Sequence, residues 1–386
     1  MKILFVIDSL GAGGAEHSTA AMMPLLRDRG HVVLVATLYD AGLGDEERTR
    51  GEGFDVQPLR ARHFVGRVRE LRARIRAERP DVVHTALFAA DMVGRVAAWR
   101  TGSRVVSSLV NTTYDPARRA DPNVRRWKLQ VVQCLDAVTG RVLVDRFHAV
   151  SEGVAEVNAR DLHVPRSRIT VVQRGRSQDR LGEWTSARRE AVRRTLGVPE
   201  GAKVVIAVGR QEHQKAHCDL VVAVERLVGT VPDVRVLLAG REGNASAQLR
   251  HALAQRPAAA AHIELLGHRP DVPDLLCAAD ALAIPSLYEG TAGAALEAMA
   301  LRCPVVCTDL PGVRGVLTHD RNALLVPVGD AGAMAAALTT ALHDRATADR
   351  LREAGVGDFE RRFTIEIAAT AMEAFYADVV AQGRRS

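Results

Sequence analysis

Residues 2–16 read KILFVIDSLGAGGAE, an apolar run that ends at an aspartate and is followed by three glycines and the start of a helical pattern. The run is apolar on both faces, as in a strand of a parallel sheet that is covered on both sides. Glycines at such a turn permit positive φ angles and a close approach of the backbone to another group. The stretch therefore predicts the first strand, loop and helix of an α/β domain.

The same alternation continues along the first half of the chain and then begins again. Apolar runs typical of strands are separated by helical patterns of 10–15 residues in both halves. The predicted strands are 3–7, 32–37, 82–84, 104–109, 147–150 and 169–172 in the first half, and 204–208, 234–239, 263–266, 281–284, 305–307 and 323–326 in the second. Two such series in 386 residues predict an α/β fold of two Rossmann-like doubly wound domains that face each other across a cleft.

The polar, arginine-rich stretch near 175–198 is interpreted as the linker between the two domains. The N-terminal domain is accordingly placed at residues 1–180 and the C-terminal domain at 181–360, and a last helix, at about 361–386, is expected to pack back on the N-terminal domain. No run of 18 or more apolar residues occurs, so no membrane-spanning helix is predicted. The five cysteines are scattered, without a C-x-x-C pair, which argues against a metal site and indicates reduced thiols in a cytoplasmic protein.

The basic charge is concentrated in the first half of the chain. Residues 1–180 contain 29 Lys and Arg against 21 Asp and Glu, whereas the remainder contains 23 against 25. Residues 60–79 include eight arginines, with apolar residues at helical spacing. A surface helix packed on its own sheet is the preferred interpretation, and contact with an anionic membrane or acceptor is the alternative. No nucleic-acid partner is expected, because no binding motif is present and aromatic residues make up only 4%.

Two loops carry candidate anion-binding groups. Gly13 and Gly14 precede the first helix, whose amide groups can bind an anion. Arg210 and Lys215 follow the first strand of the second domain, where two cations could neutralise a diphosphate, although both could equally be ordinary loop cations. Position 16 is a glutamate where the dinucleotide fingerprint requires its third glycine, which argues against an NAD-dependent oxidoreductase.

The most informative motif is residues 285–300, which read PSLYEGTAGAALEAMA. It predicts a strand end, a loop and a helix start, and it carries the acids Glu289 and Glu297. Glu297 lies about one turn inside the helix among apolar residues, where a carboxylate is costly unless it binds something. Carboxylates suit sugar or ribose hydroxyls, and amides at a helix start suit phosphate oxygens.

These motifs resemble those of retaining GT-B glycosyltransferases of the family 4 type, the group 1 glycosyl transferases. Residues 285–300 with the following C-P-V-V of 303–306 look like the family's E-x7-E region, and Gly209-Arg210 with Lys215 is similar to its phosphate-binding motif. Residues 13–16, 81–84 and 148–153 match its N-terminal landmarks. The similarity extends over about residues 1–376.

The resemblance implies a hexosyltransferase of class EC 2.4 that uses a nucleotide-sugar donor, retains the anomeric configuration and needs neither a metal nor another cofactor. It implies that Glu289 contacts the transferred sugar and that Glu297 binds the ribose. The remaining implied donor contacts are Gly13, Gly14, Arg210, Lys215, Gly290, Thr291 and Ala292. We expect a UDP- or GDP-sugar donor and, as acceptor, a lipid-linked saccharide, a polysaccharide or a small natural product. A peripheral contact with the inner membrane face through the basic N-terminal domain is also considered.

The chain departs from the family pattern at several positions. Asn111 stands where the family often has a histidine, and an amide cannot act as a base near pH 7. Asn111 and, as an alternative, His84 are therefore the further catalytic candidates beside Glu289. Arg302 replaces a usual glycine and Gly315 a usual glutamate. These departures motivate a second hypothesis, a catalytically silent partner protein that binds a sugar nucleotide, and an NAD-dependent oxidoreductase is the third.

Overall fold

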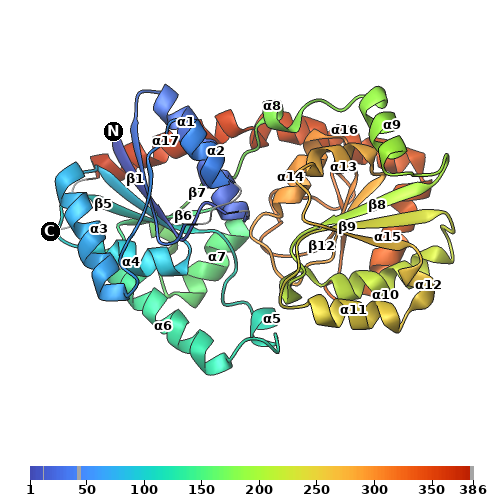
Figure 1. Ribbon diagram of the computed structural model, residues 1–386, viewed down its shortest axis with the longest axis horizontal. Coiled ribbons are helices and arrows are strands. Elements are labelled where there is room, and N and C mark those ends of the chain that lie inside the picture. Colours follow the sequence, from blue (N-terminus) through green and yellow to red (C-terminus); the bar gives the residue numbers. More distant parts are fainter. Residues whose placement is uncertain (12, 41–44, 383–386) are drawn as a thin grey trace. The chain divides into compact units, whose positions relative to one another are not determined.

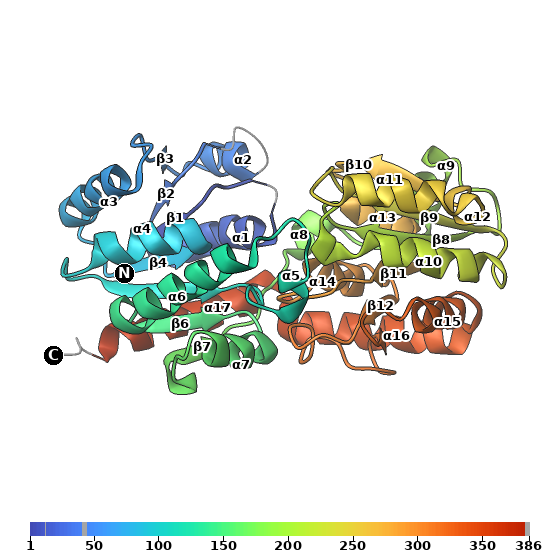
Figure 2. The ribbon, with the colours of Figure 1, turned by 90° about the horizontal axis from the view of Figure 1, so that it is seen from below.

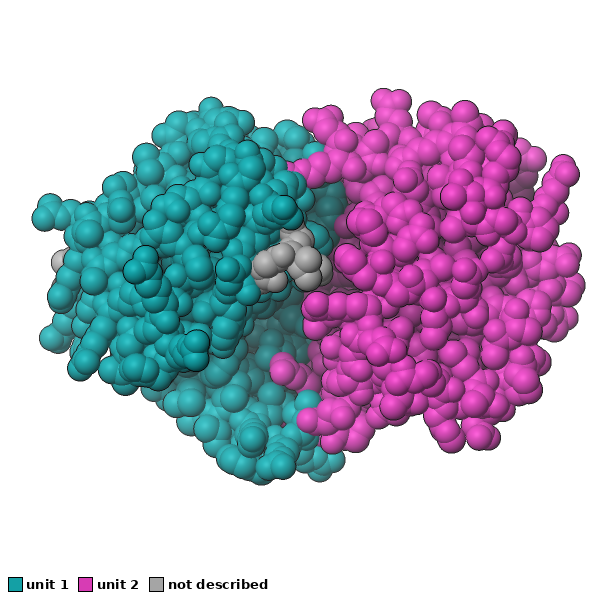
Figure 3. Space-filling view, in the orientation of Figure 1, with its two compact units in different colours: residues 1–114, 124–177, 364–386 teal, residues 115–123, 178–363 magenta. Residues whose placement is uncertain are grey.

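The structure, a computed structural model, describes residues 1–11, 13–40 and 45–382. The chain divides into two compact units, which are coloured separately in Figure 3. Unit 1 comprises residues 1–114, 124–177 and the described part of 364–386, and unit 2 comprises 115–123 and 178–363. The division between the units therefore falls three residues before the predicted boundary at 180/181, and a short segment from the first half of the sequence is grouped with unit 2.

Unit 1 is built on a seven-stranded parallel sheet in the order β3-β2-β1-β4-β5-β6-β7 (Figure 1). Its strands are β1 (Lys2–Ile7), β2 (Val32–Thr37), β3 (Val56–Pro58), β4 (Val82–Ala86), β5 (Arg104–Leu109), β6 (Arg146–Ala149) and β7 (Ile169–Val171). The strand order reverses between β1 and β4, as in a doubly wound sheet. The predicted fold class is thus confirmed for this half, and only the three-residue edge strand β3 was not predicted.

Helices cover both faces of the unit 1 sheet. They are α1 (Gly14–Asp28), α2 (Asp45–Gly51), α3 (Phe64–Glu78), α4 (Phe88–Ala98), α6 (Arg126–Leu143), α7 (Glu152–Asp161) and α17 (Ile365–Ala381), with a 3-10 turn at Arg166–Arg168. Alternate residues of β1 serve the two faces: Ile3 and Phe5 pack in one core with α1 and α17, whereas Leu4 packs in the other core with α3 and α4. The last helix of the chain is therefore part of unit 1, and it begins at Ile365, four residues later than predicted.

The arginine-rich helix α3 turns its apolar residues inward. Leu71 and Ile75 are fully buried in the core of unit 1, and Val68 packs against that core. Only Phe64 and Val65, in the first turn, are half-exposed. The preferred interpretation of residues 60–79, a surface helix on its own sheet, is therefore confirmed. None of the described helices is long and apolar enough to cross a membrane.

A buried ionic network joins α4 and α6 in unit 1. Arg95 is fully buried, and its guanidinium donates to Asp136 Oδ1 at 2.6 Å and to Ser107 Oγ at 2.9 Å. Asp91, one turn earlier on α4, lies 3.5 Å from the same guanidinium. Burial raises the pKa of Asp91 to about 7, with the Arg95 charge opposing this rise. The guanidinium is therefore balanced mainly by Asp136, which also accepts the hydroxyl of Tyr114 at 2.7 Å.

Unit 2 repeats the same topology with a six-stranded parallel sheet in the order β10-β9-β8-β11-β12-β13. Its strands are β8 (Lys203–Val208), β9 (Val234–Ala239), β10 (Ile263–Gly267), β11 (Ala281–Ile284), β12 (Val305–Thr308) and β13 (Leu324–Val326). All six agree with the predicted strands to within one residue at either end. The order reverses between β8 and β11, so this half is also doubly wound, as predicted.

The helices of unit 2 also form two layers (Figure 2). They are α5 (Pro116–Arg119), α8 (Gln178–Leu181), α9 (Ser186–Thr195), α10 (His217–Val228), α11 (Ser246–Ala254), α12 (Pro257–Ala260), α13 (Val272–Ala278), α14 (Gly293–Ala300), α15 (Ala331–His343) and α16 (Arg345–Asp358), with a 3-10 turn at His213–Lys215 and a π turn at Phe359–Phe363. One core of the sheet includes α13 and α14, and the other includes α10 and α15.

The predicted linker at 175–198 is wrong for most of its length, because α8 and α9 occupy it and belong to unit 2. The arginines that suggested a polar linker bind the end of α13. Arg189 Nη1 donates to the carbonyl oxygens of Cys277, Ala278 and Ala279, and its Nη2 donates to Asp280 at 2.7 Å. A helix end leaves carbonyl groups without partners, and a guanidinium at that point satisfies several of them at once.

Candidate active site

The predicted donor-binding residues of unit 2 lie at the carboxyl edge of its sheet. Arg210 and Lys215 are in the loop after β8, and Glu289 is in the loop after β11. These two strands are neighbours at the point where the strand order reverses. Open α/β sheets bind their ligands at such a point, because adjacent loops diverge there and leave a crevice. The topology thus places motifs that are far apart in the sequence on two adjacent loops.

An ion pair joins the two loops. Lys215 Nζ donates to Glu289 Oε1 at 2.5 Å, and Ser286 Oγ donates to the same oxygen at 2.7 Å. Glu289 is only 7% exposed. A carboxylate withdrawn from water in this way is costly unless hydrogen-bond donors and an opposite charge compensate. Lys215 and Ser286 supply both, so the carboxylate is held in one orientation.

Backbone contacts reinforce this pairing. Gln214 Nε2 donates to the carbonyl oxygen of Tyr288 at 2.8 Å, and the amide of Leu287 donates to the carbonyl oxygen of Gln214 at 2.8 Å. Gly312, in the loop after β12, also lies against this loop: a Cβ at this position would overlap the carbonyl oxygen of Glu289. Because backbone atoms cannot move aside as a side chain can, glycine is required there for the loop around Glu289 to keep its course.

The start of α14 has features of a binding site. Its N-cap residue, Ala292, has a φ of 49°, in the left-handed region, and supplies no side-chain cap. The preceding Thr291 is 2% exposed, and its Oγ1 has no hydrogen-bond partner among the described residues. Buried hydroxyls are almost always hydrogen-bonded, and strained backbone tends to occur at functional sites. A ligand oxygen at this helix start would satisfy both the hydroxyl and the first amides.

A second helix start lies on the same edge. Helix α10 begins at His217, directly after Ala216, whose φ is 47°. Burial, with a smaller contribution from the Lys215 charge, lowers the pKa of His217 to about 4. Its Nδ1 is buried and has no hydrogen-bond partner among the described residues. The ring is therefore neutral at pH 7 and retains a hydrogen-bonding position for a ligand.

Arg210 and Glu297 are more exposed than Glu289. The side chain of Arg210 is 52% exposed and lies 3.4 Å from Glu212, an exposed pairing of small energy. Its guanidinium can therefore reorient towards an anion. Glu297 is half-buried, on the second turn of α14. The combination of two cations, two carboxylates and uncapped helix starts suits a ligand that carries both phosphate and hydroxyl groups.

Gly13 and Gly14 open the first helix of unit 1. Neither residue has a positive φ, so the backbone freedom expected of this loop is not what requires glycine. A Cβ on Gly13 would overlap the carboxylate of Glu16, and a Cβ on Gly14 would lie 3.4 Å from Arg174 Nη1. The overlap at Gly13 is with the end of a flexible side chain and the distance at Gly14 is an ordinary van der Waals contact, so neither position strictly requires glycine within unit 1.

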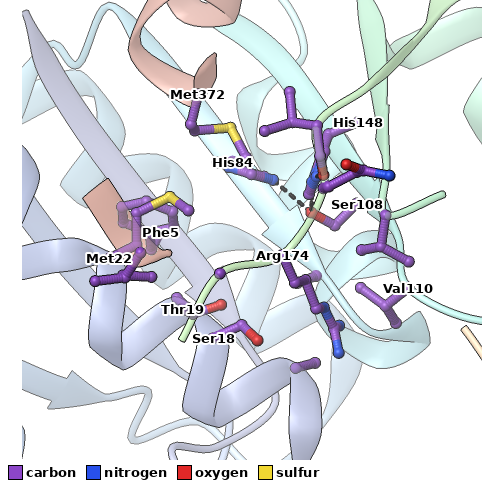
Figure 4. Close-up of a pocket in the computed structure, with 17 residues that line it drawn as sticks. Phe5, Ser18, Thr19, Met22, His84, Ser108, Val110, His148, Arg174 and Met372 are labelled. Carbon is purple, nitrogen blue, oxygen red and sulfur yellow. Dashed lines mark hydrogen bonds between the residues drawn. The ribbon is translucent and has the colours of Figure 1, made fainter. Parts of the chain in front are cut away.

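His84, one of the catalytic candidates, belongs to a chain of hydrogen bonds in unit 1 (Figure 4). Its Nδ1 lies 2.5 Å from the hydroxyl of Tyr376. Its Nε2 lies 2.7 Å from Ser108 Oγ, a contact drawn as a dashed line in Figure 4. Ser108 Oγ in turn lies 2.8 Å from His148 Nδ1, and His148 Nε2 lies 3.0 Å from the carbonyl oxygen of Val172. The chain connects β4, β5 and β6 with α17, and it borders a pocket of about 40 Å³, large enough for a few water molecules.

The direction of every bond in this chain follows from its last member. The carbonyl oxygen of Val172 can only accept, so His148 must donate through Nε2. Burial lowers the pKa of His148 to about 4 and that of His84 well below its ordinary value, so both rings are neutral at pH 7. Each neutral ring has one donor, and the hydroxyls of Ser108 and Tyr376 must therefore donate to His148 Nδ1 and His84 Nδ1. Both nitrogens of His84 are thus engaged.

We expect the acid stability of the protein to depend on His148. Its pKa is about 4 in the folded chain and 6.5 as the ordinary value, so the unfolded chain binds the proton more readily between these values. The free energy of unfolding should fall as the pH falls from about 6.5 to about 4, by a total of about 3 kcal/mol from this residue. Urea unfolding, followed by the fluorescence of Trp99 and Trp127 in a Trp184→Phe background, measures this.

In the same background, the free energy of unfolding of His148→Gln should fall by about 3 kcal/mol less than that of the parent between pH 6.5 and pH 4, because glutamine does not titrate. The exposed His63 provides the control, and His63→Gln should retain the pH dependence of the parent. Equal pH dependence of the parent and His148→Gln would contradict the assignment.

Asn111, the third catalytic candidate, lies just after β5. Its Oδ1 accepts from the amide of Thr112 at 2.8 Å, and its carbonyl oxygen accepts from Asn158 Nδ2 at 3.1 Å. The residue is half-buried and its side-chain oxygen is used within its own turn. Asn111, His84, Gly13 and Gly14 all belong to unit 1, whereas the other predicted site residues belong to unit 2.

The two departures Arg302 and Gly315 both occupy left-handed backbone, with φ of 56° and 89°. The glycine usual at position 302 thus has a physical explanation, because a side chain there costs about 1 kcal/mol. Several residues of the site were not identified from the sequence: Ser286, Gln214, His217 and Gly312 in unit 2, and Ser108, His148 and Tyr376 in unit 1. Gln214, Ser286 and His148 lay within motifs already noted, whereas the others had no local signal.

Comparison with known proteins extends over most of the chain. Residues 12–180 match the model of Glycosyltransferase Family 4, and residues 188–357 match that of Glycosyl transferases group 1. A 2-deoxystreptamine N-acetyl-D-glucosaminyltransferase of Streptomyces fradiae is 28% identical, over 94% of this chain and 90% of its own. A D-inositol 3-phosphate glycosyltransferase of Xylanimonas cellulosilytica is 30% identical, over 77% of this chain and 72% of its own.

Among solved structures, Alr3699/HepE of Anabaena in complex with UDP and glucose has the same fold. Its TM-score is 0.85 at 20% sequence identity, over 98% of this chain and all of the other. The agreement of two successive family models, a relative at 30% identity and this fold leads to one assignment. The chain belongs to the GT-B glycosyltransferases in which a Family 4 region is followed by a group 1 region.

Proposed function

We propose that this glycosyltransferase moves a hexose from a UDP-sugar to an acceptor hydroxyl, with retention of the anomeric configuration and without a metal ion. The observation that supports it most directly is the loop pair of unit 2, in which Lys215 and Glu289 are hydrogen-bonded beside an uncapped helix start. A nucleoside diphosphate sugar offers what these groups require, namely two phosphates for the cations and amides, and hydroxyls for the carboxylates.

The choice of UDP is supported by the solved structure of Alr3699/HepE, which was determined with UDP and glucose. In the proposal, Arg210 and Lys215 neutralise the diphosphate, Glu297 binds the ribose hydroxyls and Glu289 the hydroxyls of the hexose. The two cations of the chain would then take the place of a divalent ion in stabilising the leaving phosphate. Gly290, Thr291 and Ala292 contribute the helix-start amides and the unpartnered hydroxyl.

Retention is proposed to follow a front-face route. The bond between the anomeric carbon and the leaving phosphate breaks, the acceptor oxygen attacks from the same side, and its proton passes to a phosphate oxygen. Glu289 Oε1 already accepts from Lys215 and Ser286, which weakens it as a nucleophile and suits it to hold hydroxyl groups instead. Stabilisation of the leaving diphosphate is the main requirement of such a route.

The acceptor is proposed to bind to unit 1. A lipid-linked saccharide, a polysaccharide and a small natural product each offer a hydroxyl, and the two named relatives act on deoxystreptamine and inositol 3-phosphate, which are small polyhydroxylated rings. The position of Arg174 beside the unit 1 pocket favours an acceptor with an anionic group. A cytoplasmic location completes the proposal, since both the donor and the reduced cysteines fit that compartment.

Titration calorimetry with UDP in the presence of EDTA tests the donor half. We expect UDP to bind, and Glu297→Ala to weaken it about ten- to a hundredfold, because a charged hydrogen bond contributes about 1.5–3 kcal/mol. The exposed Glu353 on α16 gives the matched control, and Glu353→Ala should bind UDP as the parent does. If neither UDP nor GDP binds, the proposal fails.

Release of glucose or N-acetylglucosamine from the UDP-sugar, measured with the purified chain, separates an active enzyme from a catalytically silent partner protein. Release or transfer that continues in EDTA would support the metal-independent route. A chain that binds UDP without any turnover, with every acceptor class offered, would instead fit the silent partner that the departures at Asn111, Arg302 and Gly315 suggested.

A further inference from the structure

Helix α6 of unit 1 carries a row of exposed apolar side chains. Trp127, Val131, Leu135, Val138 and Val142 have exposed fractions of 60%, 50%, 49%, 56% and 73%. They follow one another at intervals of three or four residues, so they lie on a single face of the helix. We call these five residues the α6 apolar face. Monomeric proteins rarely leave so many large apolar side chains together in water.

The opposite side of α6 packs on the core of unit 1. Leu129 is buried in the core of unit 1, and Gly140 lies under the ring of Phe147. Asp136 points inward and binds the buried Arg95, and Gln133 donates to the carbonyl oxygen of Asp161 at 2.8 Å. These contacts fix the rotation of the helix about its axis. The helix thus has one apolar side that packs on the core and a second that stays about half exposed or more.

The exposed charged residues of α6 itself have one sign. Residues 125–143, all of which the structure describes, include the exposed cations Arg125, Arg126, Lys128 and Arg141. The only acid in this stretch is Asp136, which faces the core. If two copies of the chain met through this face, the cations of one α6 would meet those of the other, and α6 offers no exposed acid to balance them. An anionic apolar surface, in contrast, would be complementary to it.

We propose that the α6 apolar face docks on the surface of an anionic lipid bilayer, with the helix lying parallel to the membrane. The valines and the leucine would enter the boundary between headgroups and acyl chains, and Trp127 would lie at headgroup depth, where its ring can be partly apolar and partly hydrated. Lys128 and Arg141 lie on either side of the row and would contact the lipid phosphates. Figure 2 shows α6 beside α4, on the outside of the sheet of unit 1.

The inference concerns unit 1 alone and does not depend on the proposed transferase activity. If both hold, the docked enzyme would take an acceptor that is itself in the membrane, which favours the lipid-linked saccharide among the three acceptor classes. It also replaces the earlier candidate for membrane contact, residues 60–79, by a different helix, because the apolar side of α3 is buried.

Sedimentation with lipid vesicles tests the proposal on the full-length chain. We expect binding to vesicles of phosphatidylcholine and phosphatidylglycerol in equal parts, weakening as salt is added, and little binding to phosphatidylcholine alone. Val131→Ser with Leu135→Ser should reduce the affinity about tenfold or more, since both side chains lose their apolar contact. Phe64→Ser with Val65→Ser, an exposed apolar pair on α3, is the matched control and should bind like the parent.

A second measurement does not depend on loss of binding. In a Trp99→Phe and Trp184→Phe background, the fluorescence of Trp127 should shift to shorter wavelength when anionic vesicles are added. Unchanged UDP affinity and thermal midpoint of the α6 variant would show that it remains folded. The proposal is overturned if the parent does not bind anionic vesicles, if the α6 variant binds as well as the parent, or if light scattering finds a dimer that the α6 substitutions dissociate.

Discussion

Glu289→Gln is expected to lower kcat about a hundredfold while leaving the fold intact. The substitution keeps the shape of the side chain but removes the charge that Lys215 faces at 2.5 Å, and it can place an amide donor against that ammonium group. A charge-assisted hydrogen bond is about twice as strong as a neutral one, and loss of one positioned group in a transition state costs about a hundred- to a thousandfold. Initial rates of transfer or hydrolysis of the UDP-sugar, at saturating donor, measure the effect.

Two further variants make this result interpretable. Lys215→Met removes the other partner and should weaken UDP binding as well as turnover, because the proposed role of the ammonium group includes the diphosphate. Glu264, which pairs with Arg235 at 2.7 Å on the surface of unit 2, is the control, and Glu264→Gln should change kcat less than twofold, because exposed pairs contribute about 0–1 kcal/mol. If the kcat of Glu289→Gln lies within threefold of the parent value, Glu289 does not contribute to the chemical step.

Arg95→Met is expected to have the largest effect on stability, a decrease of about 3–5 kcal/mol in the free energy of unfolding. Asp136 would lose its guanidinium partner in a site that is largely closed to water, and an unpaired buried charge is costly. Asp91 contributes less, because its pKa of about 7 allows it to become neutral. Urea unfolding at pH 7, with thermal unfolding as a second measure, gives the difference from the parent.

Adding Asp136→Asn to Arg95→Met should recover part of the lost stability, because the unpaired charge is then gone. Where the single variant does not fold, Asp136→Asn alone provides a milder test and should still destabilise unit 1. Arg100→Met, at an exposed position just after α4, is the control and should alter the stability by less than about 0.5 kcal/mol. If Arg95→Met lowers the free energy of unfolding no more than Arg100→Met does, the buried ionic network does not stabilise the unit.

Several elements of the site could be predicted from the sequence because the pattern that indicates each of them lies within a short stretch of the chain. The strand, loop and helix of residues 285–300 could be placed from an apolar run, a glycine pair and a helical pattern, and the structure has β11 and α14 in that order. The loop cations Arg210 and Lys215 were noticed because they directly follow a strand. The contact between Lys215 and Glu289 was not foreseen, since it joins residues 74 positions apart and depends on β8 and β11 being neighbours.

The linker prediction was wrong because polar residues were judged by their type and not by their partners. Arg189 made residues 175–198 look like a linker, but the guanidinium completes the end of α13. Residues 60–79 were interpreted correctly in spite of their arginines, because the apolar spacing indicated that Ile75 and its neighbours face the core. Only the fold shows that Trp127 and Val142 of α6 lie on the outside of unit 1.

The sequence by itself determined the two parallel sheets, because strands that are apolar on both faces and helices with one apolar stripe leave few arrangements that bury all of that surface. It also determined the family, through motifs that are contiguous in the chain. Tertiary structure alone decided which groups meet: Lys215 with Glu289, His84 with Tyr376, and Arg95 with Asp136. Such pairs depend on strand order and on the rotation of each helix. Both are set by packing across the whole unit, so no short sequence pattern predicts them.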